Sequence, residues 1–432
     1  MKLAINGGDP VRSRPFPAYR TIGPEEKDAV ATVLDSGVLS QYLACWSDSF
    51  YGGSQVRALE KEWAEYFRVK HAIAVNSCTS GLYCAVAATG IEPGQEVIVS
   101  PFTMSASATA PLIYNAIPVF ADIEEDCFCL DPVSVEQHIT SLTKAIIAVD
   151  IFGQPYDVER INDIARRHGL YVIEDAAQAP GARYKDRFAG TLGHIGIFSL
   201  NYHKHIHCGE GGIVVTDDDE LAEKIRLVRN HAEAVVEGKG VTDIVNMIGF
   251  NLRMTEIEAS IGLCQLKKLE RLLKARQENC KYVSEHLQEI SAISVPVVRK
   301  DCEHAYYVQP FKFSEQEAGI SRDCFVKAVK AELAYTELRE NEGVNISCGY
   351  VKPLYLQPLF QKRICYGSKG CPFESPWYQG QVAYNKGICP VTERMHEKEL
   401  FTHELMHSFL TKEDLDDVIN AFLKVWENRK EL

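Results

Sequence analysis

The sequence lacks the features that mark membrane, secreted, fibrous and disordered chains. No apolar run approaches the roughly 20 residues that a membrane-spanning helix needs. The first ten residues contain no basic region followed by an apolar stretch, so we expect no secretory signal. No internal repeat or low-complexity tract stands out, and 46% apolar with 24% charged residues is typical of a globular protein. A chain of 432 residues is expected to form two domains.

Positive charge is also scarce. The 46 Lys and Arg residues face 59 Asp and Glu residues, which gives a net charge of −13. Such a surface repels nucleic acid and anionic lipid, so neither is an expected partner, although a local basic pocket is not excluded. The 14 cysteines are even in number but scattered through a long chain. This usage favours reduced thiols in a cytoplasmic protein.

Short runs of β-branched and other apolar residues recur through the first 220 residues. Several have apolar residues at consecutive positions, as expected for strands that are covered on both faces. The predicted strands are Ala72–Val75, Glu96–Val99, Pro118–Asp122, Ala145–Asp150, Tyr171–Asp175, Ile197–Leu200 and Gly212–Thr216. The predicted helices between them are Ser80–Ala88, Ser105–Tyr114, Pro132–Ile139, Asp157–His168 and Glu220–Arg229. This alternation predicts an α/β sheet that is mostly parallel.

The pattern changes after Asn251. Helices are predicted at Met254–Lys274, Gln277–Ile290, Arg322–Leu333 and Lys412–Asn428, with a strand at Tyr306–Phe313. We therefore predict an N-terminal arm at residues 1–20, a large α/β domain at residues 21–275 and a smaller α+β domain at residues 276–432.

Polar residues follow two of the predicted strands where ligands bind in open α/β sheets. The strand ending at Val75 is followed by Asn76–Gly81, whose hydroxyls and backbone N–H groups would suit a phosphate. A plain helix N-cap explains the same residues. Asp175 closes another buried strand, where it needs a partner because an unpaired buried charge is costly. A cationic ring nitrogen of a cofactor would serve, as would an N-cap or an internal salt bridge.

Lys204 lies in a loop between two apolar strands, just before the glycine turn Gly209–Gly212. A Lys in a partly dry place can have a lowered pKa and can form a Schiff base. Potential metal ligands surround it: His203, His205, His207 and Cys208. Their alternation would place them on one side of an extended segment, but no second cluster completes a site, so we expect no metal.

These three features carry more meaning together than alone. They follow one another along a single predicted sheet edge, which is the arrangement that pyridoxal 5'-phosphate needs. The phosphate site would anchor the cofactor, and the Asp would keep its pyridine nitrogen protonated so that the ring withdraws electrons. The Lys would hold the aldehyde and later move the proton.

The sequence also resembles a known family, the vitamin-B6-dependent sugar aminotransferases of the DegT/StrS group, over nearly its whole length. The motifs that carry the resemblance are Leu3–Gly8 with Pro10–Arg12, Asn76–Gly81, Pro101–Ser107, Glu174–Gly181, Ser199 with Lys204 and Gly209–Gly212, Gly249–Glu256, Pro353–Tyr355 and Cys389–Arg394. The resemblance implies a fold of the aspartate aminotransferase type. This fold has a large domain with a mostly parallel seven-strand sheet and a smaller C-terminal α+β domain.

The resemblance further implies the roles of individual residues. Lys204 would form the Schiff base with the cofactor, and Asp175 would pair with the pyridine nitrogen. Gln178 would hydrogen-bond the phenolic oxygen of the ring. The phosphate would be held by Cys78, Thr79 and Ser199. Asn251 would reach the phosphate in the neighbouring subunit, which implies a homodimer with shared active sites, and Arg253 would contact an anionic group of substrate or phosphate.

Three positions depart from the family pattern. Cys78 stands where Gly is usual, and Asn201 stands where His is usual, although an amide can still donate a hydrogen bond. Met104 occupies the position that usually offers an aromatic ring to the pyridine, and a buried core position is the alternative interpretation. The segment Ile364–Gly387 is longer than a minimal member needs. It either shapes the acceptor pocket or is a surface excursion.

The implied activity is transfer of an amino group from L-glutamate or L-glutamine to a keto sugar by ping-pong kinetics. A nucleotide-linked keto-deoxysugar is the expected acceptor, and a keto-cyclitol, as in aminoglycoside precursors, is the alternative. A related dehydrase is disfavoured, because such enzymes lack the Schiff-base Lys. A non-catalytic metal-binding or regulatory protein built around the histidine run is the remote alternative.

Overall fold

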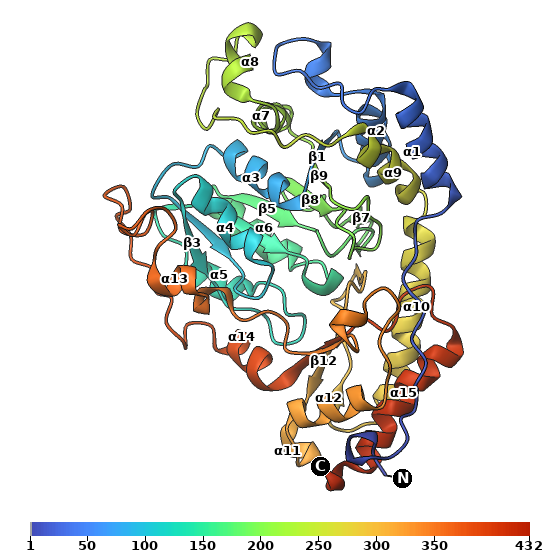
Figure 1. Ribbon diagram of the computed structural model, residues 1–432. Helices are drawn as coiled ribbons and strands as arrows, with labels where there is room; N and C mark the ends of the chain where they lie inside the picture. Colours follow the sequence, from blue (N-terminus) through green and yellow to red (C-terminus); the bar gives the residue numbers. More distant parts are fainter. Residues whose placement is uncertain (1) are drawn as a thin grey trace.

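A seven-strand sheet forms the centre of the computed structural model, which describes residues 2–432. Its strand order is β1-β9-β8-β5-β4-β2-β3. The strands are β1 (His71–Val75), β2 (Glu96–Val99), β3 (Ile117–Phe120), β4 (Thr143–Val149), β5 (Tyr171–Asp175), β8 (Ile195–Ser199) and β9 (Gly212–Thr216). Only β9 runs against its neighbours, since it pairs antiparallel with both β1 and β8. The predicted fold, a mostly parallel seven-strand α/β sheet, is confirmed (Figure 1).

The helices of this part cover the sheet on both sides. They are α1 (Pro24–Ser36), α2 (Ser54–Phe67), α3 (Cys78–Ala88), α4 (Ser105–Ile113), α5 (Pro132–Gln137), α6 (Val158–His168), α7 (Asp219–Arg229), α8 (Ala232–Lys239) and α9 (Glu256–Leu266). Every residue of β2, β3, β8 and β9 is buried, which explains the consecutive apolar residues within them. Helix α3 packs on β8 and β9, so its first residues reach the ends of these strands.

A second, smaller sheet lies below the first in Figure 1. It contains β10 (Ile293–Ser294), β12 (Gln309–Phe313), β14 (Leu400–His403) and β13 (Ile346–Cys348), in that order. The helices of this C-terminal part are α10 (Leu269–Leu287), α11 (Glu315–Ala318), α12 (Arg322–Ala331), α13 (Pro358–Lys362), α14 (Pro390–Arg394) and α15 (Lys412–Glu427). Of these, α13 and α14 lie beside the large sheet, where the Phe360 ring contacts that of Phe120 in β3 and the start of α14 donates to Asp122. A three-strand sheet joins β11 (Cys302–Glu303) to β6 (Arg183–Tyr184) and β7 (Arg187–Phe188). The predicted domain bounds at residues 20 and 275 stay a prediction.

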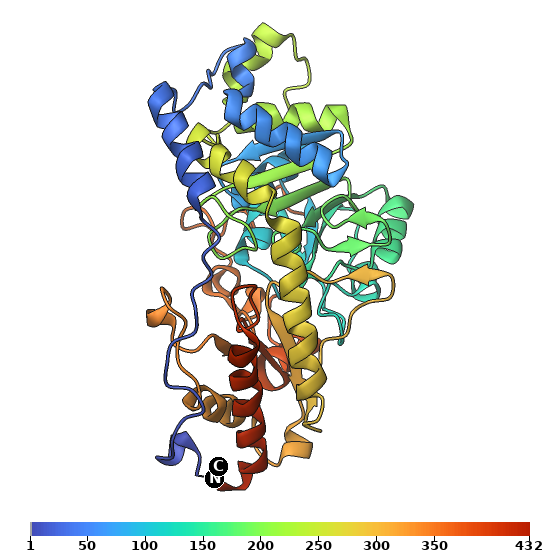
Figure 2. The same ribbon diagram turned by 90° about the vertical axis from the view of Figure 1, so that its right-hand side faces the viewer.

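The N-terminal arm runs along the length of the molecule beside α15 (Figure 2). Its Leu3 and Phe16 are buried in the core of the smaller sheet. The guanidinium of Arg12 donates to Asp414 and Asp417, each at 2.8 Å, and stacks 4.0 Å above the Phe16 ring. The arm therefore has no core of its own and depends on buried charge pairing with α15.

The excursion Ile364–Gly387 covers the edge of the large sheet. The hydroxyl of Tyr378 donates to Glu96 at 2.9 Å, and that of Tyr384 donates to the Pro118 carbonyl at 2.7 Å. Glu96 and Pro118 lie at the beginnings of β2 and β3, whereas ligands bind at the carboxyl ends of parallel strands. Of the two interpretations of this segment, the surface excursion fits these contacts. Among residues 2–432, no helix is long and apolar enough to cross a membrane.

We predict that Arg12→Ala destabilises the arm. Asp414 is buried, and removing one partner of a buried ion pair costs about 3–5 kcal/mol. The variant should unfold at lower denaturant concentration and should be cut by protease within residues 1–20 under conditions that spare the unaltered protein. Arg14→Ala is the control, because that side chain is exposed and 3.9 Å from Asp414. Equal stability of the two variants would contradict the anchoring role of Arg12.

Candidate active site

The parallel sheet brings three chain segments together at one edge. The start of α3 follows β1, Asp175 ends β5, and the loop that carries Lys204 follows β8. Asp175 and Lys204 are both near enough to the Cys78 thiol for their charges to affect its pKa. Burial, followed by the Asp175 charge, raises the pKa of Cys78 well above its usual range, so the thiol stays neutral.

The start of α3 forms a cradle of backbone N–H groups. Ser77 caps the helix, since its hydroxyl accepts from the Ser80 backbone N at 3.1 Å. Gly212 of β9 lies against this turn, and a Cβ atom there would come within 2.7 Å of the Cys78 backbone N. A side chain at position 212 would thus fill the space before the helix N-terminus. Cys78 and Thr79, both half-buried, are the first two helical residues.

Asp175 is a buried carboxylate whose exposed fraction is 5%. Ser107 donates to its Oδ2 at 2.8 Å, and the backbone N of Ala177 donates to its Oδ1 at 3.2 Å. Burial raises the pKa of Asp175, and these two hydrogen bonds and the Lys204 charge oppose the rise. Within residues 2–432 its hydrogen-bond partners are a hydroxyl and an amide, so the carboxylate has room for a cationic partner from outside the chain.

Lys204 lies in a turn that Asn201 and Tyr307 help to define. Its backbone N donates to the Asn201 carbonyl at 2.9 Å, and its Nζ lies 4.1 Å from the centre of the Tyr307 ring. Asn201 in turn donates to Glu210 at 2.9 Å, while its own backbone N donates to the Ser199 hydroxyl at 3.2 Å. These contacts hold the loop that carries the Lys204 amine in place.

Gln178 is held by two hydrogen bonds. Its Oε1 accepts from the Phe152 backbone N at 2.8 Å, and its Nε2 donates to the Tyr350 hydroxyl at 3.1 Å. Burial raises the pKa of Tyr350 to about 12. The amide of Gln178 retains a second N–H, which is what the predicted contact with a ring oxygen requires.

Asn251 and Arg253 lie together beside the cradle rather than within it. The Arg253 Nε donates to the Asn251 Oδ1 at 2.7 Å, and the backbone N of Asn76 donates to the Leu252 carbonyl at 2.9 Å. Asn251 is exposed.

Met104 precedes α4 with 61% of its surface exposed, so the alternative of a buried core position is wrong. Its stacking role stays a prediction.

The expectation that His203, His205 and His207 lie on one side of an extended segment is wrong. The segment is a series of turns and bends. His205 is buried, and its Nε2 makes a hydrogen bond of 2.8 Å to the Ala305 carbonyl. His203 packs on the Tyr202 ring with 3.7 Å between centroids, and the backbone N of His207 donates to the Gln265 Oε1 at 3.4 Å. In the described chain, residues 2–432, no three His, Cys, Asp or Glu residues are grouped as metal ligands.

Three neighbours of the site escaped the sequence reasoning: Ser107, Tyr307 and Tyr350. Ser107 belongs to a recognised motif, but its bond to Asp175 depends on how α4 packs over β2 and β3. Tyr307 and Tyr350 come from the C-terminal part of the chain that contains the smaller sheet (the smaller unit), more than 100 residues after the Lys204 loop. Only a contact between the two units brings them to it.

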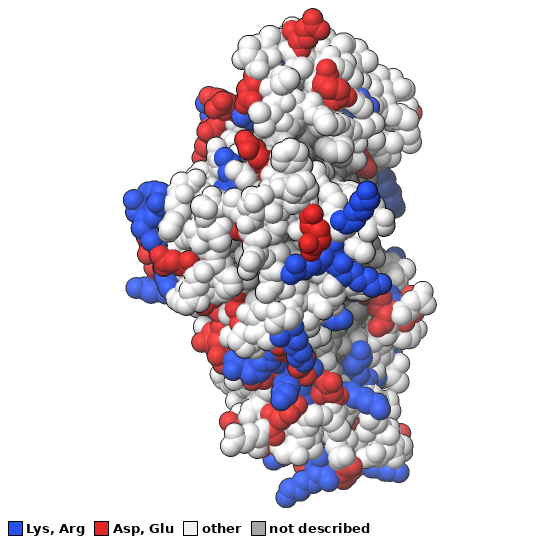
Figure 3. Space-filling view, turned by 90° about the vertical axis from the view of Figure 1, so that its left-hand side faces the viewer, with Lys and Arg blue, Asp and Glu red and all other residues white. Residues whose placement is uncertain are grey.

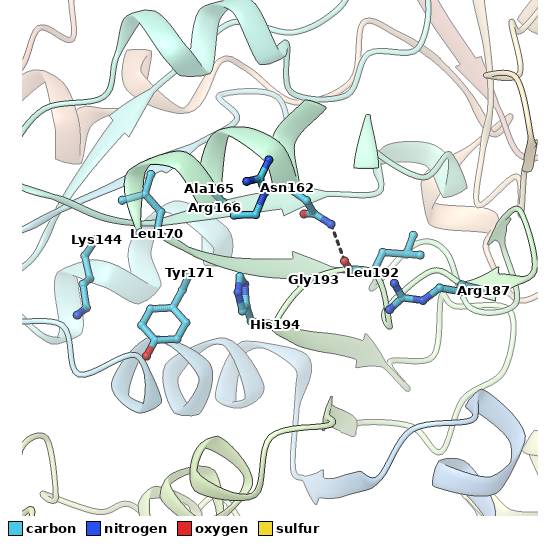
Figure 4. A pocket seen from close by; sticks show the side chains of 11 residues that line it. Lys144, Asn162, Ala165, Arg166, Leu170, Tyr171, Arg187, Leu192, Gly193 and His194 are labelled. Atoms are coloured by element: carbon cyan, nitrogen blue, oxygen red, sulfur yellow. Dashed lines mark hydrogen bonds between the residues drawn. The ribbon is translucent and has the colours of Figure 1, made fainter. Parts of the chain in front are cut away.

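Another pocket lies away from this edge, at the beginnings of β4, β5 and β8 (Figure 4). Its volume is about 620 Å³. Lys144, Arg166 and Arg187 lie apart in it and do not converge on one point. Arg166 pairs with Asp163 and stands in the last turn of α6, where basic residues favour the helix dipole. This pocket is at the edge opposite Asp175 and Lys204.

Comparison with known proteins agrees with this geometry. Residues 22–375 match the model of the DegT/DnrJ/EryC1/StrS aminotransferase family. The chain is 33% identical over 406 residues to the spore coat polysaccharide biosynthesis protein SpsC of Bacillus subtilis, covering 93% of this chain and 94% of the relative. It is 30% identical over 447 residues to the L-glutamine:2-deoxy-scyllo-inosose aminotransferase of Streptomyces kanamyceticus, with 99% and 97% covered.

Among solved structures, DesI crystallised in the presence of its TDP-sugar product is similar, with a TM-score of 0.78 and 26% identity. The similarity covers 99% of this chain and 97% of that chain. Each of these similarities extends over most of the chain, and the region of the family match includes Asp175 and Lys204. The chain therefore belongs to the DegT/DnrJ/EryC1/StrS aminotransferase family and is an enzyme that transfers amino groups.

Proposed function

We propose that the enzyme uses pyridoxal 5'-phosphate to transfer the amino group of L-glutamate or L-glutamine to the keto group of a sugar. The observation that carries this proposal is Asp175. It is a buried carboxylate without a cationic hydrogen-bond partner in residues 2–432, and it lies close to Lys204 and the start of α3. A protonated ring nitrogen supplies the missing positive charge.

The residues present fit this cofactor. The backbone N–H groups at the start of α3, kept open by Gly212, suit a phosphate, and a hydroxyl set from Thr79 and Ser199 adds donors. Gln178 offers an amide N–H to the ring oxygen. When bound, the cofactor supplies an electron-withdrawing ring that stabilises negative charge at the carbon next to the transferred nitrogen.

Lys204 would act in two ways. Its Nζ would hold the cofactor's aldehyde carbon, and, once released by the amino donor, would move a proton at the donor's α-carbon. The nearby ring of Tyr307 limits the directions from which Nζ can approach and shields it from water. Ser107 and Ala177 hold the Asp175 carboxylate by hydrogen bonds, which would keep its charge available to the ring nitrogen of a bound cofactor.

The acceptor we favour is a nucleotide-linked keto-deoxysugar. Support comes from DesI, which shares the fold over nearly the whole chain and was crystallised in the presence of its TDP-sugar product. A keto-cyclitol is the second candidate, because a relative that is 30% identical over 99% of this chain is named for an inosose. The exposed Met104 would suit either acceptor, since a flexible thioether at this position would take up less space than an aromatic ring.

A homodimer with shared active sites is part of the proposal. Asn251 is exposed beside the cradle, where it is free to reach a neighbouring subunit. The face on the α3, α4 and α8 side has few charged side chains over its upper part (Figure 3). The loop after α8 exposes Ile244, Val245 and Ile248, which is a typical composition for a surface that another subunit covers.

Borohydride reduction and an acceptor screen test the function. Reduction should fix the cofactor on Lys204, and Lys204→Ala should abolish both labelling and turnover, whereas the exposed Lys185→Ala should change neither. Keto sugars and keto-cyclitols are then screened for return of the aminated cofactor to its aldehyde form by absorbance. Labelling of a different lysine would refute the assigned role of Lys204.

Asp175→Asn should retain the fold but lose activity by about 100-fold or more. A neutral amide does not hold the ring proton, and losing one partner of a buried ion pair costs about 3–5 kcal/mol, each 1.36 kcal/mol being tenfold in rate. Steady-state kinetics and circular dichroism of the variant give the answer. The control is Asp186→Asn, on an exposed turn. Turnover near that of the control would contradict the proposed pairing.

Subunit mixing tests the shared site. Combining Lys204→Ala with Asn251→Ala should produce hybrid dimers with one repaired site, which restores activity to about a quarter of the normal level after random exchange. Mixing Lys204→Ala with Asp175→Asn is the control, because both residues serve the same subunit's site and no recovery is expected. Absence of recovery in the first mixture, with exchange verified by mass, would exclude a role of Asn251 across the interface.

A further inference from the structure

Two buried carboxyl groups, those of Asp150 and Glu174, lie side by side behind Asp175. Parallel pairing of β4 and β5 aligns Ala148 with Glu174 and Val149 with Asp175. Because side chains alternate along a strand, Asp150 and Glu174 point to one face of the sheet and Asp175 points to the other. Asp150 and Glu174 are each 0% exposed. The proposed function gives neither group a role.

The two carboxyl groups differ in the donors that reach them. Glu174 accepts three backbone N–H groups, from Gly190 at 2.7 Å, Leu192 at 2.7 Å and Gly193 at 3.0 Å. The Oδ1 of Asp150 accepts from the Tyr156 backbone N at 3.0 Å. Its Oδ2 is buried and receives no donor from residues 2–432. A buried carboxylate oxygen without a donor is costly, so Oδ2 is the atom that needs a proton.

A hydrogen bond between the two carboxyl groups also requires a proton. Such a bond contributes to the pKa of both Asp150 and Glu174. Two ionised carboxylates only accept hydrogen bonds, so one of the pair must be protonated for the bond to form. The three backbone donors favour the ionised form of Glu174, which leaves Asp150 as the protonated partner.

No cation near the pair offers an alternative. The groups that perturb either carboxyl are each other, Asp175 and backbone N–H groups. The other titratable groups that feel the Asp150 charge are Tyr156, Cys129 and Cys302. Burial raises the pKa of all three, that of Cys302 to about 11, so they are neutral. Burial, followed by the charge of its partner, likewise raises the pKa of Asp150 well above its usual range.

We propose that Asp150 and Glu174 share one proton at neutral pH, which is carried on the Asp150 Oδ2 and donated to the Glu174 carboxylate. The backbone N of Asp150 also donates to the Asp175 carbonyl at 3.1 Å. The pair therefore fastens the end of β4 to the end of β5, and Asp150 is a positioning residue for Asp175. The shared proton leaves one negative charge rather than two behind Asp175. This inference does not depend on the cofactor or on the acceptor.

The proton makes stability fall as the pH rises. An unfolded chain releases the Asp150 proton above about pH 4, whereas the folded protein keeps it. Each further pH unit therefore raises the unfolding equilibrium constant about tenfold through this one proton. Asp150→Asn has no such proton to lose. In urea unfolding of the full-length protein between about pH 5 and about pH 8, the unfolding constant of the unaltered protein should grow about tenfold per pH unit relative to that of Asp150→Asn.

Asp186→Asn is the matched control, because Asp186 lies on an exposed turn and its variant should follow the unaltered protein at every pH. A constant ratio between the unaltered protein and Asp150→Asn would overturn the proposal, because Asp150 would then be ionised in both the folded and the unfolded state.

The place of the proton predicts a difference between two isosteric variants. Asp150→Asn keeps an acceptor for Tyr156 and gains an N–H for Glu174, so stability at neutral pH should be retained or increased. Glu174→Gln would set amide N–H groups against the backbone N–H groups that Glu174 accepts, so this variant should unfold at lower urea concentration than Asp150→Asn. The opposite order, or failure of Asp150→Asn to fold, would contradict the assignment of the proton to Asp150.

Infrared spectra of the folded proteins give a readout that needs no unfolding. A protonated carboxyl group has a carbonyl stretch that is distinct from the bands of a carboxylate and that shifts in heavy water. The unaltered protein and Asp186→Asn should show this band at neutral pH with greater intensity than Asp150→Asn. Equal intensity in all three proteins would overturn the shared proton and would leave the aminotransferase function untouched.

Discussion

The burial of one negative charge governs the arrangement of the site. Asp175 ends a central strand where water is excluded, and a charge in such a place is stable only with compensating partners. A hydroxyl and an amide N–H compensate for part of that cost. The cradle at α3 and the Lys204 loop lie on the same edge because β1 and β8, the strands that precede them, run in the same direction as β5 within one sheet. The position of the carboxylate therefore determines where a cationic ring can lie.

The residue before Asp175 shows how differently the same fold treats a structural carboxyl. Glu174 is fully buried on the other face of β5 and accepts from the backbone N atoms of Gly190, Leu192 and Gly193 at 2.7–3.0 Å. Gly190 has φ of +85° and lies against Phe198, so no side chain fits there. Burial raises the pKa of Glu174 and of its neighbour Asp150. Backbone N–H groups donate to Glu174 and Asp150, whereas Asp175 still has room for a further partner at the site.

Features of the sequence that depend on local pattern were predictable. The consecutive apolar residues of β5 and β8 predicted buried parallel strands. The positions of Asp175 at the end of β5 and of Lys204 in the loop after β8 predicted the site. Helix α1 was not predicted, because it is polar at most positions and only Glu26 and Val33 of it are buried. Helix α2 was missed although its buried residues Val56, Leu59, Trp63 and Phe67 recur at helical spacing. The histidines were misjudged because alternation in sequence means a shared face only in an extended segment, and turns govern this one. Contacts such as Tyr307 with Lys204 depend on packing across more than 100 residues, which no local pattern encodes.

Tyr307 is the point at which the smaller unit enters the active site. Its backbone N donates to the Phe152 carbonyl at 2.7 Å, and its carbonyl accepts from Arg276 on α10. The preceding Ala305 donates to the Gly153 carbonyl at 2.8 Å, and Gly153, with φ of +102°, lies so near the Tyr306 backbone that a Cβ atom would come within 2.7 Å. These bonds tie the segment before β12 to the loop after β4, at the same sheet edge as Asp175. Because the Tyr307 ring faces Lys204, any shift between the two units changes the surroundings of the amine, so the reactivity of Lys204 depends on both.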